Sequence, residues 1–322
     1  MSALLKTKRK YDILALMALI AAGLTFHTPA PSQELTYNSG QPVLPLYLGY
    51  MEKPDGFDMY FGYLNNNWQE EVDVPIGPDN NIAPAQPMGP DGGQPTHFLP
   101  RMNRWQFTVH VPADFGSKEI VWTVESHGSI NRAYGVIRPG YILDDYVIQH
   151  DFGSDSTHDR KNPILQVEGA KERDVKVGEP VQLVAVATDP NPSRARGGRG
   201  GGRATAQQAR SFGELSGAIG GDGIRSSPAG LRLAWYQYRG AGIVKFDPPQ
   251  FKVWEDQRGG SPWAPGWQPP PIPSDNKWII RATFPAAGTY VLRCLAHNGS
   301  KFVYESVVFN VSGSGNSASV GH

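Results

Sequence analysis

Apolar and polar residues alternate along several short stretches in the first half of the chain. The clearest stretch sets Trp105, Phe107, Val109 and Val111 between polar neighbours, which is the period of a strand with one solvated face. A hairpin is predicted earlier, because two apolar runs flank the tight-turn signal Pro54-Asp55-Gly56. The two runs of the hairpin, followed by the segments that continue the strand pattern, are Leu46–Tyr50, Phe57–Tyr63, Ile120–Val124, Tyr134–Val136 and Tyr146–Ile148.

The segment Pro75–Pro100 interrupts these patterns. It holds seven prolines and cannot be a central strand, because proline lacks the N–H group that a strand ladder needs. We expect a long ordered loop or a lid in its place.

The second half of the chain has the strand order of an immunoglobulin-like sandwich. Pro285–Gly288 followed by Tyr290 resembles the turn and tyrosine found where the two sheets of such a sandwich meet, and Trp235 falls where these folds bury a tryptophan. The predicted strands are Val181–Ala187, Leu231–Trp235, Trp278–Phe284, Thr289–Leu295 and Phe302–Val311.

Composition narrows the fold class further. The 322 residues include 37 glycines and 28 prolines, which favour turns and long loops over long helices. The single cysteine, Cys294, excludes an intrachain disulfide and a cysteine-based zinc cluster, and we interpret it as a small buried apolar group. The sequence therefore predicts an all-β protein of two β-sandwich-like domains with long Pro/Gly-rich loops, preceded by one short N-terminal apolar helix.

Composition shifts along the chain suggest the domain boundaries. Two stretches inside the second domain are too rich in Gly, Arg and Pro to build a core, and we treat them as insertions. The predicted parts are 1–30 as signal peptide or membrane anchor, 31–42 as linker, 43–160 as a β-rich domain, 161–312 as the immunoglobulin-like sandwich with insertions 189–230 and 255–276, and 313–322 as a flexible tail.

The N-terminus has the order of an export signal. Four basic residues between 6 and 10 precede an apolar run from 13 to 26, which directs a chain across a membrane with its basic end inside. The run is shorter than a straight membrane-spanning helix, and the cleavage site is poor, so a cleaved signal and a retained anchor both stay open. Either way we expect a periplasmic protein, anchored in the inner membrane or exported after cleavage. The anchor residues would be Ile13, Leu16, Leu19, Ile20, Leu24 and Phe26.

Charge is divided between the two halves, although the formal net charge is zero. Residues 31–160 contain 17 acidic and 7 basic residues, whereas residues 161–322 contain 12 acidic and 19 basic residues. Such a separation orients a chain beside a charged neighbour, and it also suits attraction between its own two domains. Export argues against nucleic acid as a partner.

Motifs for catalysis are few. The stretch 150–159 concentrates metal-ligand types, but their spacing fits no ligand set on a helix or strand, so we prefer a solvated linker and keep His150, Asp151 and His158 as weak metal candidates. There is no nucleophile elbow and no phosphate-binding loop. We expect no enzymatic activity and no cofactor.

The two insertions are the better candidates for binding. The first is rich in arginine and glycine, and the second is stiffened by proline and carries tryptophans, which either dock a partner or fold back over a sandwich edge. The candidate partner-binding residues in and beside these insertions are Arg194, Arg196, Arg199, Arg203, Trp254, Trp263 and Trp267.

Several segments resemble an exported bacterial family of unassigned activity. They include PDG at 54–56, FGYLNNN at 61–67, DVPIGPDN at 73–80 and GQPTHFLPR at 93–101, and the resemblance extends to the Trp-rich segments near 235 and 263. The resemblance implies an exported location and a two-part β architecture, without a reaction. Within these segments, Gln94, Thr96, His97 and Arg101 are the polar side chains expected to converge on a partner or on a neighbouring strand.

These features predict a non-enzymatic extracytoplasmic structural or binding subunit, tethered by its N-terminal segment. It would dock on subunits at the periplasmic face of a larger membrane protein complex of respiratory or photosynthetic type. One alternative is a carbohydrate- or cell-wall-binding module in which Trp263, Trp267 and Tyr238 stack on sugar rings. The other is a metal-dependent hydrolase built on His150, Asp151 and His158, with His97.

Overall fold

The computed structural model describes residues 37–84, 89–144, 147–148, 161–191, 230–264, 267–299 and 301–313. These residues belong to one compact unit. Strands make up nearly all of the regular structure in this part of the chain, so the prediction of an all-β fold with two sandwiches is confirmed. The expected N-terminal helix and the anchor residues lie outside the described residues.

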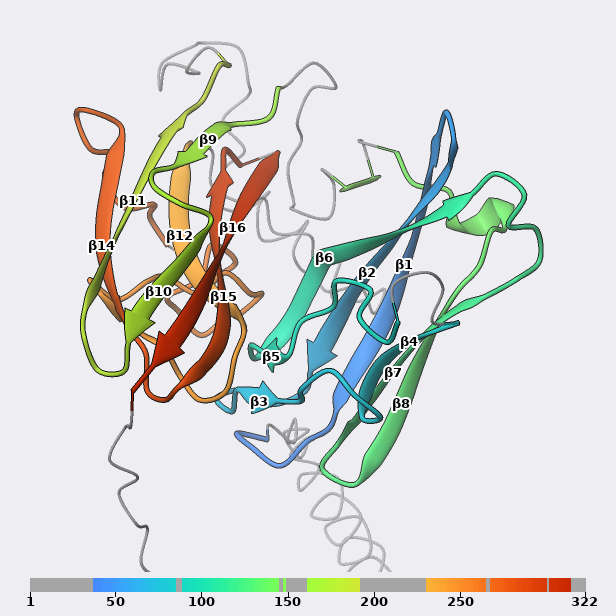
Figure 1. Cartoon of the computed structure of the whole chain (residues 1–322). Coiled ribbons are helices and arrows are strands. Elements are labelled where there is room, and N and C mark those ends of the chain that lie inside the picture. The colour runs from blue at the N-terminus through green and yellow to red at the C-terminus, as the bar shows by residue number, and fades with distance from the viewer. Residues whose placement is uncertain are drawn as a thin grey trace, which may run out of the picture. The chain divides into compact units, whose positions relative to one another are not determined.

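The first sandwich packs two three-stranded sheets face to face, with a two-stranded ribbon beside them (Figure 1). One sheet has the order β1-β2-β6, the other has the order β4-β7-β8, and the ribbon pairs β3 with β5. The bounds are β1 Val43–Lys53, β2 Gly56–Asn65, β3 Val72–Asp73, β4 Asn80–Ala83, β5 His97–Phe98, β6 Arg101–Pro112, β7 Ile120–Ser126 and β8 Ser129–Gly135.

The predicted hairpin is the β1–β2 pair, with Lys53 opposite Gly56 across the turn. Alternate residues of the strands point inward and build an aromatic core between the two sheets. Phe107 stacks on Phe61 at 5.2 Å between ring centroids and meets the edge of Trp122 at 4.9 Å. The strict period of two seen in the sequence therefore marks the face that is buried.

Two predictions in this region are wrong in part. The segment Pro75–Pro100 contains the short strands β4 and β5 as well as loop, because Asn80–Ala83 pairs with β7 at a sheet edge, where the nearby prolines cost no ladder bond. Val147 and Ile148, expected in a strand, lie in a helical turn, and the Ile148 N–H donates to the Asp144 carbonyl at 3.2 Å.

Strand β6 has an irregular start. The pairing with β2 slips between Phe61 and Tyr63, which leaves a bulge near Trp105. Trp105 has a φ of 57°, which is strained for a bulky side chain, and Arg101 has a φ of 58°. Bulges re-aim side chains. This one turns the segment from Arg104 to Gln106 away from the regular ladder.

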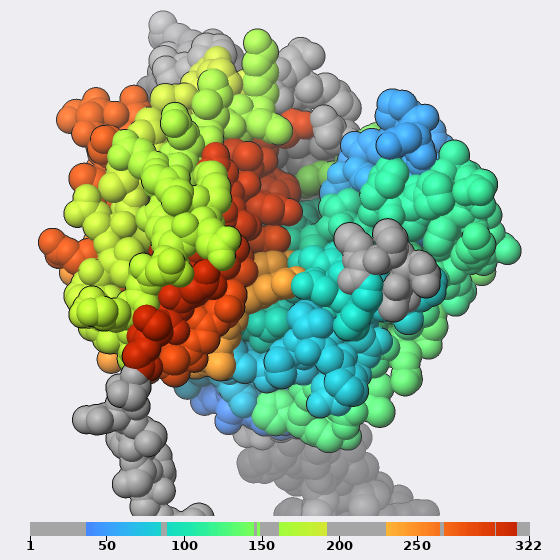
Figure 2. Space-filling view, viewed as in Figure 1, coloured from blue at the N-terminus to red at the C-terminus, as the bar shows by residue number. Residues whose placement is uncertain are grey.

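The second sandwich has two four-stranded sheets, ordered β9-β11-β14-β13 and β10-β16-β15-β12. When the strands are lettered in chain order, with β9 as A, β10 as A′ and β11 to β16 as B to G, the spatial orders are A-B-E-D and A′-G-F-C. These are the two sheets of an immunoglobulin-like domain, so the predicted strand order is confirmed. Figure 2 shows β10 and β16, a parallel pair, side by side on the surface in yellow-green and red. The bounds are β9 Ile164–Val167, β10 Glu172–Lys176, β11 Val181–Thr188, β12 Arg232–Arg239, β13 Lys245–Asp247, β14 Lys277–Thr283, β15 Gly288–His297 and β16 Phe302–Ser312.

Tyr290 forms the corner that the sequence indicated. Its hydroxyl donates to the Ala286 carbonyl at 3.1 Å and to the Ala241 carbonyl at 2.8 Å. The disulfide cysteine of such domains stands two residues after this tyrosine, and here that position is Leu292, which shares the core with Leu183. Cys294 lies two residues further along the same buried face and is a free, buried thiol, as expected.

No helix in the parts of the chain listed above is both long and apolar enough to cross a bilayer.

Candidate binding site

The outer face of β12 is covered by the first sandwich. Ordinarily an edge strand is buried on one face only, yet seven consecutive residues of β12 are buried. Inward residues such as Trp235 fill the second core, while Tyr236 and Tyr238 on the opposite face pack with Leu99 of the first sandwich in a small separate cluster. We call the contact between the two sandwiches the seam.

Backbone groups of β12 are hydrogen-bonded across the seam. The Thr96 N–H donates to the Tyr238 carbonyl at 3.2 Å, and the Gly240 N–H donates to Thr96 Oγ1 at 3.1 Å. The Tyr238 hydroxyl donates to the Gly93 carbonyl at 2.6 Å. The segment before β5 thus pairs with an edge strand that would otherwise offer free N–H and C=O groups.

An ion pair joins the sandwiches next to these bonds. The two terminal nitrogens of Arg239 bind the two oxygens of Asp91 at 2.9 and 2.8 Å, and Arg239 Nε donates to the Gln94 carbonyl at 2.9 Å. The hydrogen bonds from Arg239 hold the pKa of the Asp91 carboxyl below its usual value. This bidentate geometry fixes orientation as well as distance.

His97 is buried between two carboxylates of the first sandwich. Its Nδ1 lies 2.7 Å from Asp73 Oδ1 and its Nε2 lies 2.7 Å from Glu71 Oε2. Burial alone would lower the pKa of His97, but the hydrogen bonds with Asp73 and Glu71 outweigh it and raise the pKa. Asp73 also accepts a bond from the Gly242 N–H at 2.7 Å, so the histidine supports the seam.

Trp68 is held between two guanidinium groups, one from each sandwich. The guanidinium carbons of Arg101 and Arg258 each lie 4.0 Å from its ring, and Arg258 also donates to the Trp68 carbonyl at 2.7 Å. Burial would raise the pKa of Asp256, but hydrogen bonds from Arg258 and Lys252 lower it, so Asp256 anchors the arginine. Cation–π stacking of this kind contributes most where water is excluded.

These contacts settle where the predicted polar residues lie. Gln94 is fully buried, with its amide bonded to the Gly92 N–H at 2.7 Å and the Pro90 carbonyl at 2.8 Å. Thr96, His97 and Arg101 make the contacts given above. The structure therefore favours the intrachain alternative for these four residues, and an outside partner would find the side chains of Gln94 and His97 buried.

The tryptophans of the second insertion fold back over the second sandwich. Trp254 packs against the seam cluster. Trp267 meets Phe251 at 5.3 Å between ring centroids and lies under the guanidinium of Arg232 at 5.8 Å. Burial lowers the pKa of Arg232 to about 9. Trp263 remains partly exposed and lines a hollow.

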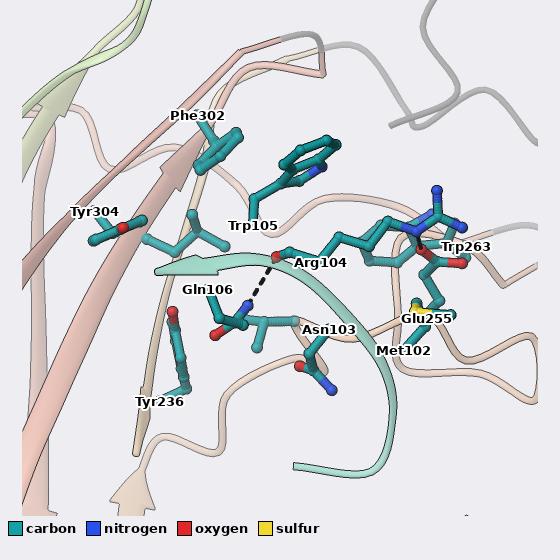
Figure 3. Close-up of a pocket in the computed structure, with 12 residues that line it drawn as sticks. Met102, Asn103, Arg104, Trp105, Gln106, Tyr236, Glu255, Trp263, Phe302 and Tyr304 are labelled. Carbon is teal, nitrogen blue, oxygen red and sulfur yellow. Dashed lines mark hydrogen bonds and ion pairs between the residues drawn. The ribbon is translucent and has the colours of Figure 1, made fainter. Parts of the chain in front are cut away.

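That hollow, the smaller of the two that Tyr236 lines, lies beside the bulge of β6 and has a volume of about 50 Å³. Figure 3 shows the Trp105 and Phe302 rings near each other at one side of it, and Trp263 beside Arg104 and Glu255 at another. Arg104 Nε lies 3.2 Å from Glu255 Oε1, and this ion pair joins the two sandwiches.

The larger hollow has a volume of about 220 Å³. It opens where β12 and β13 are the edges of the two sheets of the second sandwich. Tyr236 and Val253 line both hollows. The wall of the larger hollow is formed mainly by Trp235, Phe246, Phe251 and Trp254, with Glu71 and Leu99 from the first sandwich.

Three indole N–H groups around these hollows are unpaired. The Nε1 atoms of Trp105, Trp235 and Trp254 are buried, and none has a hydrogen-bond partner among the described residues. A buried donor without a partner costs about 1–3 kcal/mol, so such groups are rare unless they serve a ligand or water. Trp105 lines the smaller hollow, and Trp235 and Trp254 line the larger one.

The remaining candidates lie outside the described residues. They are Arg194, Arg196, Arg199 and Arg203 of the first insertion and the weak metal candidates His150, Asp151 and His158. Within the described ranges, no three His, Cys, Asp or Glu side chains are grouped in a way that could hold a metal ion.

Comparison with known proteins identifies no family for this chain. No protein-family model and no curated protein matches the chain. Among solved structures, the eight N-terminal immunoglobulin domains of the Down Syndrome Cell Adhesion Molecule align at 9% identity over 84% of this chain and 27% of that one, with a TM-score of 0.23. An I-band fragment of titin aligns at 9% identity over 83% of this chain and 65% of that one, with a TM-score of 0.22. The chain thus spans less than two thirds of either, and TM-scores this low carry no argument about its fold or its function.

The sequence pattern missed most of the residues that build the site. Asp91 and Arg239 are 148 positions apart, and no local pattern links them. One signal was available for β12: Tyr236 and Tyr238 put large aromatic groups on the face that alternation assigned to solvent. That combination indicates a strand covered on both sides.

Proposed function

We propose that this chain is a non-enzymatic binding subunit that works outside the cytoplasm, tethered by its N-terminal segment. In this proposal, two sandwiches locked along the seam present the hollows to a larger membrane protein complex. The observation that carries the binding role is the pair of hollows whose walls are rich in tryptophan, tyrosine and phenylalanine. Aromatic side chains of this kind dominate binding surfaces, because they bury a large area and offer a directed donor.

The polar residues of the seam support a binding role over a catalytic one. His97, Asp73, Asp91 and Arg239 have the types used in catalysis, but each is engaged in contacts inside the chain. A catalytic base or nucleophile needs a free approach to its substrate.

The location rests on the sequence. Basic residues before the apolar run 13–26 favour export or anchoring, and the periplasmic docking surface follows from that orientation. The charge difference between the two halves supports docking on a charged neighbour as well as attraction across the seam.

Gentle detergent extraction followed by sizing tests this proposal. We expect the chain to migrate with other membrane proteins, which mass spectrometry of the same fraction identifies. A Trp263→Ala variant should weaken this association, because Trp263 is a partly exposed wall of the smaller hollow. Ile279→Ala is the matched control, because Ile279 is 53% exposed on β14, away from the hollows. A lone species of 35.2 kDa at native abundance would contradict the proposal.

The carbohydrate alternative loses one of its three residues. Tyr238 is buried, and the guanidinium carbon of Arg293 lies 3.2 Å from its ring centroid, so a sugar cannot stack there. Trp263 and Trp267 remain partly exposed, so this alternative keeps two of its three residues.

A further inference from the structure

The ring of His97 lies between two carboxylates, and this arrangement requires one proton more than a neutral ring carries. His97 is 1% exposed, with Asp73 Oδ1 2.7 Å from Nδ1 and Glu71 Oε2 2.7 Å from Nε2. Ionised carboxylates only accept hydrogen bonds, so both ring nitrogens must carry an N–H group, as they do in the imidazolium. If the proton moved to one carboxyl, the three groups together would still hold it. We call these three residues the His97 cluster.

The elements packed against the His97 cluster supply no other group that titrates near neutral pH. Buried tyrosines lie on β2, β12 and β15, and burial raises the pKa of each phenol above its usual value of 10: Tyr63, Tyr236, Tyr238 and Tyr290. These phenols stay neutral at the pH where a histidine titrates. Strand β12 also carries Arg239, whose guanidinium is bound to Asp91. A change of protonation near neutral pH therefore belongs to the His97 cluster itself.

The two carboxylates of the His97 cluster are held unequally. Asp73 lies opposite His97 in the ribbon of β3 and β5, and its Oδ2 accepts from the Gly242 N–H of the second sandwich at 2.7 Å. Glu71 precedes β3, and within the described part of the chain its carboxylate is hydrogen-bonded only to His97. Glu71 also lines the larger hollow. Loss of the shared proton should therefore free Glu71 rather than Asp73.

We infer that the His97 cluster is a pH-dependent switch on the wall of the larger hollow, in which loss of one proton releases Glu71 and leaves Asp73 bound across the seam. The neutral ring keeps one N–H group, at Nδ1 beside Asp73, and presents a lone pair at Nε2 to Glu71. A lone pair and a carboxylate repel each other at hydrogen-bond distance, so the Glu71 side chain turns away. Its charge, no longer balanced by the imidazolium, is then added to the wall of the hollow.

The direction of the switch follows from the same contacts. Burial would lower the pKa of His97, but the hydrogen bonds with Asp73 and Glu71 raise it, so the proton is lost on the alkaline side of 6.5. Below that transition the charge of Glu71 is balanced. Above it, the aromatic wall of the hollow gains a negative charge and favours a partner with basic groups. The switch itself needs no partner, whereas its effect on binding rests on the proposed function.

The test follows single side chains in the full-length chain, in detergent micelles, by NMR from about pH 5 to pH 9. The readouts are the ring ¹⁵N resonances of His97 and the carboxyl ¹³C resonance of Glu71, both assigned through the backbone. We expect the Nε2 resonance of His97 to move downfield to the position of an unprotonated nitrogen, with Nδ1 nearly unchanged. The Glu71 resonance should move with the same midpoint, above pH 6.5.

Two variants separate the switch from a general effect of pH. Glu71→Gln removes the charge but keeps a side chain that can donate to a neutral ring, so the His97 midpoint should shift to lower pH. His110→Gln is the matched control, because His110 also lies beside two carboxylates, Asp58 at 2.8 Å and Asp55 at 3.6 Å, but its side chain is 46% exposed. That variant should leave the midpoints of His97 and Glu71 unchanged. The titration of the parent chain decides the question even where a variant fails to fold.

Three results would overturn the inference: a His97 ring with only one protonated nitrogen from pH 5 upward, a ring that keeps both protons to pH 9, or a Glu71 resonance that stays constant while His97 titrates. A histidine with a purely structural role would give the last of these. The inference and the proposed function fail separately. A chain whose Glu71 and His97 titrate together but which is extracted alone lacks only the membrane partner. A chain that is extracted with a complex while Glu71 does not respond to pH lacks only the switch.

Discussion

The two sandwiches satisfy the hydrogen bonds of their buried backbone groups in different ways. In the second, strands joined by turns pair their own N–H and C=O groups around a core of mostly apolar and aromatic side chains, and only two amides, Gln237 and Asn298, are buried among its described residues. In the first, long irregular segments are buried, and side-chain amides bind their carbonyls. The buried amides are Asn65, Asn67, Asn80, Gln94 and Asn103.

The difference shows what an irregular buried segment requires. A buried carbonyl without a partner costs free energy of the same order as a lost hydrogen bond, and loop backbone has no ladder to supply one. Asn65 Nδ2 donates to the Glu70 and Phe98 carbonyls at 2.8 and 3.0 Å, and Asn103 Nδ2 donates to the Pro100 carbonyl at 3.0 Å. The asparagines therefore take the place of strand pairing in the first sandwich.

Removing the central amide should give the largest effect. Asn80 Nδ2 donates to the carbonyls of Val74 and Pro95 at 2.9 and 2.8 Å, and Asn80 Oδ1 accepts from Trp122 Nε1 at 3.0 Å. Asn80→Ala leaves all three groups buried and unpaired, and we expect a loss of about 3 kcal/mol in the free energy of unfolding, measured in urea. Asn81→Ala is the control, because its one bond is exposed, and it should cost less than about 1 kcal/mol. Equal losses in the two variants would contradict the role given to buried amides.

Removing the hydroxyl of the tyrosine corner should give the second-largest loss in the free energy of unfolding. Tyr290→Phe keeps the ring in the core but leaves the Ala241 and Ala286 carbonyls without the hydroxyl donor. The expected loss is about 1.5 kcal/mol, again from urea unfolding. Tyr134→Phe serves as the comparison, since Tyr134 is 51% exposed and its change should be close to zero. A Tyr290→Phe variant as stable as the parent would mean that the hydrogen bonds of the Tyr290 hydroxyl do not stabilise the fold.

The second sandwich was predictable from the sequence because its long strands are regular. Its five long strands show the alternation of an ordinary sandwich, and Tyr290 and Trp235 mark the corner and the core. The strands missed there, β9, β10 and β13, have three to five residues, too few for a period of two to stand out. In the first sandwich the long strands were found, but the role of Asn80 was not, because nothing local shows which carbonyls an amide will reach.

The candidate site was harder to predict than either core. It depends on contacts between residues far apart in sequence, such as Thr96 with Tyr238, and on a bulge that places Trp105 at a strained φ. Sequence patterns report the period of one strand, not which surface will cover it. The tryptophan-rich insertion was recognised as a surface of interest, but its fold over β12 and β15 was one of two alternatives.

The ion pair of the seam should contribute less to the free energy of unfolding than Asn80 or the Tyr290 hydroxyl. A double-mutant cycle of Asp91→Asn and Arg239→Gln isolates the ion pair, and we expect a coupling of about 1 kcal/mol, because the pair is bidentate but partly exposed to solvent. The coupling should fall as salt is added. Lys176 and Glu179 give the control cycle, since they lie 4.0 Å apart with side chains 71% and 65% exposed, and their coupling should be near zero. A seam coupling no larger than that control would show that Asp91 and Arg239 do not hold the sandwiches together.

The smallest effect should be the pH dependence of the free energy of unfolding, because His97 in the first sandwich and His297 in the second have opposite effects on it. The pKa of His97 is raised, so its contribution to stability is present below the unfolded value of 6.5 and is lost as pH rises through the folded pKa. Burial and the Arg232 charge lower the pKa of His297, so its contribution is present above 6.5 and is lost as pH falls toward the folded pKa. The parent protein should therefore show a shallow profile between pH 5 and 8. His97→Gln removes the stabilisation on the acid side, so its free energy of unfolding should drop more steeply than that of the parent on acidification, whereas His297→Gln should drop less. Urea unfolding across this pH range measures both, and parallel profiles for the two variants would mean that neither histidine changes its proton affinity on folding.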